Sequence, residues 1–67
     1  MPSTSDHAEL STLRSQLDDL AQRVVAVADH YRDTPDSAIM AELDATERSL
    51  GAALRTLARA TSIVEPR

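Results

Sequence analysis

Residues 10–31 read LSTLRSQLDDLAQRVVAVADHY, and large apolar side chains recur in this stretch at alternating intervals of three and four residues. This spacing, kept over three heptads, is typical of a coiled-coil seam, whose a and d positions face another helix. The a positions are Leu10, Leu17, Val24 and Tyr31. The d positions are Leu13, Leu20 and Val27. The stretch therefore predicts a long amphipathic α-helix.

Flanking residues place the ends of this helix at about residues 6 and 33. Ser5 or Asp6 is suited to cap its N-terminus, and Glu9 lies three residues after Asp6, where a carboxylate completes a capping box. Pro35 disfavours the α conformation in the residue before it, so the helix is expected to end near residue 33.

A second helix is expected over about residues 36–63, after a turn at 33–35. Thr34 is predicted as its N-cap, Pro35 as its first residue and Asp36 as an acid in its first turn. Such a short connection predicts an antiparallel two-helix hairpin. The whole chain, 1–67, is then one helical-hairpin domain.

The second helix is apolar over an arc of three parallel columns. The central column is Leu43, Leu50, Leu57 and Val64. The two flanking columns are Met40, Glu47, Leu54, Thr61 and Ile39, Thr46, Ala53, Ala60. The position of the turn predicts that the a column packs on the central column and the d column on the Met40 column, where only Leu20 opposite Glu47 is a mismatch. One partner helix cannot cover all three columns.

A chain of 67 residues is in the size range where a single core is marginal, and it has no cysteine to form a disulfide. Association is therefore expected to supply the missing stability. We expect two hairpins to form a homodimeric four-helix bundle, with a heteromeric helical protein as the alternative partner. The residues expected at helix contacts are Leu10, Leu13, Leu17, Leu20, Ala21, Val24, Val27, Ala28, Leu43, Leu50, Ala53, Leu54, Leu57 and Ala60.

Candidate catalytic and metal-binding residues are few. His30 has Asp29 and Asp33 nearby, but no second histidine joins them, and a rim position near a helix C-terminus explains it. Asp18 and Asp19 diverge by about 100° on a helix and do not converge on one ligand. We therefore predict no enzyme activity, no cofactor and no metal.

The remaining carboxylates have structural interpretations. The pairs Asp19–Arg23 and Asp44–Arg48 have the spacing of ordinary surface ion pairs. Glu47 is the one acid on an apolar column. It either fixes register or orientation by reaching an arginine, or lies at the edge of the apolar face with its carboxylate in water.

Two function classes follow from these patterns. The first is a non-enzymatic protein–protein interaction module, such as an assembly factor, adaptor or regulator, that works through helix–helix association. The alternative is an RNA- or DNA-binding hairpin dimer that uses Arg48, Arg55 and Arg59. A net charge of −4 and the lack of an exposed aromatic for base stacking argue against nucleic acid.

Two further features bear on location and packing. The longest apolar run, residues 24–28, is far shorter than the roughly 20 residues of a membrane span, so we expect a soluble, cytoplasmic protein without membrane contact. Gly51, inside the second helix, is expected to mark a close helix contact opposite Gln16.

Overall fold

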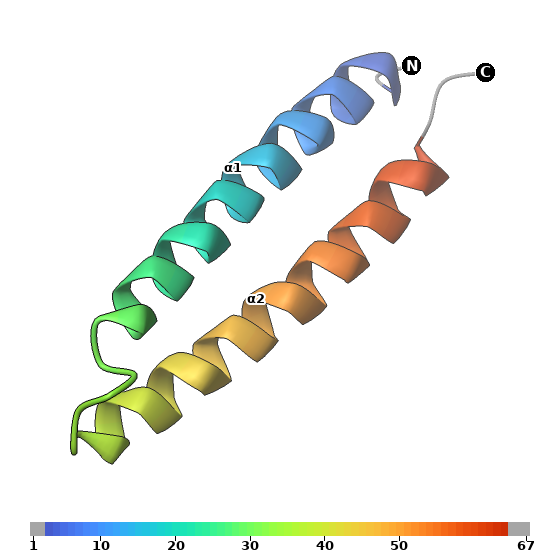
Figure 1. Ribbon diagram of the computed structural model, residues 1–67. Coiled ribbons are helices and arrows are strands. Elements are labelled where there is room, and N and C mark those ends of the chain that lie inside the picture. Colours follow the sequence, from blue (N-terminus) through green and yellow to red (C-terminus); the bar gives the residue numbers. More distant parts are fainter. Residues whose placement is uncertain (1–2, 65–67) are drawn as a thin grey trace.

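The computed structural model describes the backbone of residues 3–64 and the side chains of residues 5–64. It contains two α-helices, α1 (Ser3–Asp29) and α2 (Ser37–Ile63), which pack side by side as an antiparallel hairpin (Figure 1). Their free ends lie at the same end of the rod, opposite the turn. The predicted all-helical hairpin is confirmed.

The first helix differs from the prediction at both ends. It begins at Ser3, so Ser5 and Asp6 lie in its first turn and do not cap it. It ends at Asp29, four residues early, because the N–H groups of His30 and Tyr31 donate to the carbonyls three residues before them, both at 3.0 Å. Such bonds tighten the last turn and end α geometry.

The residue that caps α2 is Asp36, and the prediction of Thr34 is wrong. The Asp36 carboxylate accepts from the backbone N–H of Ile39 at 3.5 Å, and the helix begins at the next residue, Ser37. Thr34 instead closes the turn, because its hydroxyl donates to the Tyr31 carbonyl at 2.8 Å and accepts from the Asp36 N–H at 3.4 Å.

The hairpin is a thin rod that encloses little. Its extents are 53 × 14 × 12 Å, and its radius of gyration is 15.6 Å, against about 11 Å for a compact chain of this length. Among the described side chains none is fully buried, and only Ala28 (4% exposed) and Thr61 (5%) are classed as buried. The two helices therefore make one seam with no core around it.

Of the two predicted pairs of columns, the a column with the central column is confirmed, and the d column with the Met40 column is wrong. Leu10, Leu17 and Val24 of the a column are half-buried, as is the central column of α2. The d column does not pack on the Met40 column, since Leu13, Leu20 and Val27 remain 42%, 48% and 44% exposed. On the opposite side of the a column, Ala21 and Ala28 lie in the seam instead. Alanine lets two helices approach closely, which turns the bulkier leucines outward.

Candidate functional site

One face of the hairpin carries an open apolar groove between the two helices. Its lining residues are Leu20, Arg23, Val24, Val27, Leu43, Thr46 and Leu50. Val24 and Leu43, which the expected register pairs, both line it. Leu20 and Val27 of the d column line one side of the groove, and Leu13 lies one heptad before Leu20 on the same stripe of α1.

The exposed d column is an unused source of stability. Completing the burial of a side chain that is already half covered is worth on the order of 1 kcal/mol. Three such residues, spaced seven apart, follow one stripe of α1. A helix laid along this stripe would cover all of them.

The groove has little polar chemistry. The Thr46 hydroxyl already donates to the Glu42 carbonyl of its own helix at 2.9 Å. The Arg23 guanidinium lies 4.0 Å from the Asp19 carboxylate. The groove volume of about 510 Å³ is in the range of small-molecule sites, but such sites carry several placed polar groups that orient the ligand. The composition suits an apolar helix surface better than a metabolite.

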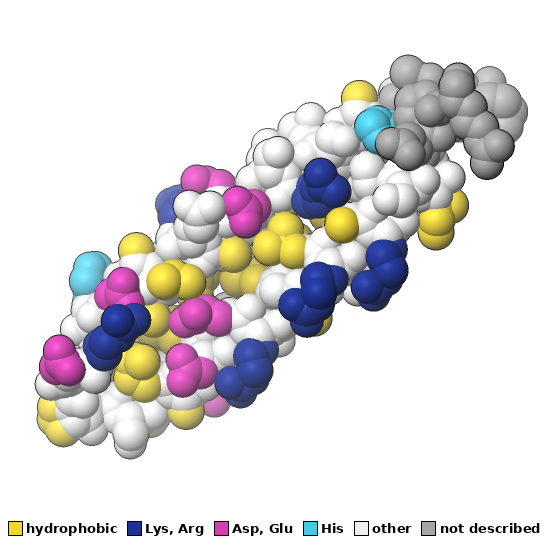
Figure 2. Space-filling model, turned by 45° about the vertical axis from the view of Figure 1, so that its right-hand side comes forward, with side chains coloured by type: hydrophobic (Ala, Val, Ile, Leu, Met, Phe, Trp, Pro, Cys, Tyr) yellow, Lys and Arg dark blue, Asp and Glu magenta, His cyan; other side chains and the backbone are white. Residues whose placement is uncertain are grey.

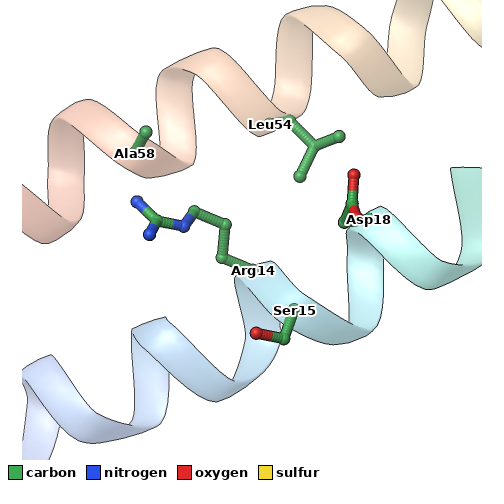
Figure 3. Close-up of a pocket in the computed structure, with 5 residues that line it drawn as sticks. All are labelled: Arg14, Ser15, Asp18, Leu54 and Ala58. Carbon is green, nitrogen blue, oxygen red and sulfur yellow. The ribbon is translucent and has the colours of Figure 1, made fainter.

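The second face carries a smaller polar crevice, shown in Figure 3. Its lining residues are Arg14, Ser15, Asp18, Leu54 and Ala58. The Arg14 guanidinium extends toward Ala58, while the Ser15 hydroxyl points away from α2 (Figure 3). The Asp18 carboxylate accepts from the Gln22 amide at 2.9 Å. The polar groups do not converge on a point where a substrate atom could react.

Only one of the two predicted surface ion pairs forms. Asp19 and Arg23 lie 4.0 Å apart, but both are about 70% exposed, which makes their contribution to stability small. Asp44 and Arg48 form no ion pair in the part of the chain that the structure describes. His30 is exposed just beyond α1.

The carboxylates beside His30 do not gather around it as metal ligands. Asp29 pairs with Arg32. Over residues 5–64, no three His, Cys, Asp or Glu side chains cluster in a way that would hold a metal ion. No candidate metal site therefore lies within residues 5–64.

Glu47 and Gly51, both predicted to matter for packing, make few contacts in the structure. Glu47 is half-buried, and within the described residues its carboxylate makes no hydrogen bond or ion pair, so a role in specificity stays a prediction. Gly51 does not mark a close helix contact. A Cβ at this position would meet only the Arg55 guanidinium, at 3.6 Å.

Three arginines of α2 are exposed on the side of the helix away from α1. They are Arg48, Arg55 and Arg59. Arg59 donates to the Thr56 hydroxyl at 3.2 Å, and none of the three pairs with a carboxylate among the described residues. Figure 2 shows basic side chains along one edge of the molecule toward the termini, and acidic ones gathered toward the turn.

The structure divides the predicted contact residues into an inner and an outer set. The inner set, buried or half-buried, is Leu10, Leu17, Ala21, Val24, Ala28, Leu43, Leu50, Leu54, Leu57 and Ala60. The outer set, exposed, is Leu13, Leu20, Val27 and Ala53. No protein-family model, curated protein or solved structure matches this chain. No α-helix in the described residues is long and apolar enough to cross a membrane.

Proposed function

We propose that this protein is a non-enzymatic interaction module, an assembly factor, adaptor or regulator, that works by helix–helix association. The observation that carries the proposal is the exposed d column beside the apolar groove. Leucine and valine at heptad spacing, 42–48% exposed, form a continuous stripe that the hairpin itself does not cover.

The shape and chemistry of this face favour a helical occupant. Recognition of a helix uses a long apolar groove with anchors spaced by one or two turns, which is the spacing of Leu13, Leu20 and Val27. The groove floor is formed by Val24, Leu43 and other aliphatic side chains, and no carboxylate lines it. A cytoplasmic location fits a chain without cysteine, because disulfides are typical of small secreted domains.

Two neighbouring valines give a matched test. Val27 lines the groove and is 44% exposed, while Val25 is 40% exposed and lies outside the groove. We expect V27E to abolish association, because a carboxylate would have to be buried without a partner, and V25E to leave it unchanged.

The measurement is native mass spectrometry of tagged wild type, V25E and V27E recovered gently from the host. Wild type and V25E are expected to carry a second polypeptide, of the same or another sequence, and V27E to run alone. A wild-type chain found only as the free 7.3 kDa species would overturn the proposal. Equal association of V25E and V27E would move the contact away from the groove.

The exposed arginines support a second candidate, an RNA- or DNA-binding hairpin dimer. Arg48, Arg55 and Arg59 lie on one side of α2 without carboxylate partners among residues 5–64. The net charge of −4 opposes this candidate, because nonspecific binding to phosphates depends on excess positive charge. Retention on an RNA column that R55A/R59A abolishes would support it, and equal flow-through of both proteins at 50 mM salt would exclude it.

A further inference from the structure

We propose that the occupant of the apolar groove is a second copy of this chain, laid antiparallel so that each turn covers the partner's open end. This proposal rests on the proposed function and names its partner. The groove faces of the two hairpins would meet, with α1 over the partner's α1 and α2 over the partner's α2. The interface is then the same surface on both copies, as a two-fold axis requires.

The exposed area is the first argument for a second copy. The chain exposes 5052 Å², whereas a compact protein of its mass exposes roughly 4,200 Å². The excess of roughly 850 Å² is close to the area of about 800 Å² that each partner loses in a standard protein interface. One further hairpin is enough to remove it.

The charge pattern along α1 is self-complementary. Glu9, Gln16 and Arg23 repeat every seven residues and so share one stripe of the helix, and Arg23 borders the groove. Gln16 is the middle residue of α1. A two-fold axis at Gln16 sets Glu9 of each copy level with Arg23 of the other. The opposite charges then meet twice, and the two glutamines meet at the centre.

The same axis matches large with small side chains along α2. Leu50 is the middle residue of α2. A two-fold axis half a residue before this centre, between Ser49 and Leu50, sets Thr46 level with Ala53 of the other copy and Ile39 level with Ala60. These four residues form the flanking column on the groove side, which carries no charge.

The distribution of charge along the rod decides against the parallel arrangement. Residues 29–47, around the turn, hold six carboxylates and one arginine, a net charge of −5. The remaining described residues, 5–28 and 48–64, hold four carboxylates and five arginines, a net charge of +1. A parallel dimer would place the two −5 segments together, whereas the antiparallel dimer places each one beside the partner's open end.

Single cysteines test this geometry cleanly, because the native chain has none. Gln16 and Ser49 are both exposed. Gln16 lies four residues before Leu20 on α1 and Ser49 three residues after Thr46 on α2, so each neighbours a lining residue of the groove on its helix. In the antiparallel dimer each is close to its own copy across the axis. In a parallel dimer each faces the other residue on the partner instead. Ser15, next to Gln16 but turned about 100° away on the outer side, is the matched control.

The experiment measures disulfide formation in the purified full chain under mild oxidation. We expect Q16C alone and S49C alone to form covalent dimers at least 10-fold faster than S15C. Cross-links that form only when Q16C and S49C are mixed would overturn the antiparallel arrangement. Rates equal to that of S15C, with a monomer by sedimentation velocity, would overturn the second copy as occupant.

Failure of this proposal and failure of the proposed function are separable. A monomeric purified chain that still carries a different polypeptide when recovered from the host, and loses it with V27E, would retain helix–helix association and reject the homodimer. A chain that is alone in both experiments would reject both.

Discussion

A Cβ added to Gly51 would meet only the Nη1 atom of Arg55, at 3.6 Å, which is ordinary contact with the end of a flexible side chain. Gly51 also has no positive φ that would require glycine. Glycine inside a helix costs about 1 kcal/mol relative to alanine.

We therefore expect G51A to raise the free energy of unfolding by about 1 kcal/mol, or the melting temperature by about 4–8 °C. Gly51 lies away from the groove, so the stoichiometry should not change. Thermal and urea unfolding followed by circular dichroism measure the effect, and A52G, on the exposed neighbour, should lower stability by a similar amount. A destabilised G51A would show that another chain packs against this position.

The Thr34 hydroxyl holds the turn together by bonding to the Tyr31 carbonyl and the Asp36 N–H. We expect T34V to lower the free energy of unfolding by about 1 kcal/mol, since the side chain keeps its size and loses both bonds. T34S retains the hydroxyl and should lose much less. T56V is a control for threonine on an exposed helix surface, where the hydroxyl donates to a helix carbonyl. If T34V and T34S lowered the free energy of unfolding equally, the hydroxyl would not be what stabilises the turn.

Glu47 is half-buried on an apolar column and makes no ion pair within residues 5–64. Its replacement separates the two interpretations of this residue. If the carboxylate only reaches water at the edge, E47L should raise stability by about 1 kcal/mol, because it adds apolar burial and removes a partly desolvated charge. The oligomer mass should stay the same. A change in stoichiometry or in the Q16C cross-link would instead identify Glu47 as a residue that fixes orientation.

The antiparallel dimer predicts a charge-swap result between Glu9 and Arg23. E9R places like charges opposite each other twice per dimer. Each exposed pair is worth about 0.2–1 kcal/mol and two pairs are lost per dimer, so the dissociation constant should rise roughly 2- to 30-fold. The double variant E9R/R23E restores opposite charges and should recover most of the affinity. Sedimentation equilibrium at 50 mM salt measures this, and the difference should shrink at 500 mM. An additive double variant would mean that these two residues do not meet.

The helices and their antiparallel order could be predicted because the 3-4 spacing is a local signal. Val24 and Leu43 line the same groove, as the turn position predicted. The end of α1 could not be predicted, because the bonds that unwind it, from His30 and Tyr31, are available to any sequence. The cap was misassigned because Thr34 and Asp36 are both good caps, and only geometry selects between them.

The face left open could not be predicted for a different reason. Both flanks of the a column, Leu13–Leu20–Val27 and Ala21–Ala28, are apolar, so hydrophobicity alone does not decide which one enters the seam. The smaller side chains allow closer packing between two helices, and this choice depends on the backbone separation. The candidate interaction surface is therefore the flank Leu13–Leu20–Val27, which the hairpin does not bury in its seam.

The hairpin is joined covalently at one end only, at the turn, while α1 begins and α2 ends at the other. In such a thin helix pair the unlinked ends separate first. Amide hydrogens near residues 5–10 and 58–64 should therefore exchange with solvent fastest in an isolated hairpin. In the antiparallel dimer, each opening end rests on the closed end of its partner. Protection from exchange should then become nearly even along the rod. Its dependence on protein concentration would report the affinity of the dimer.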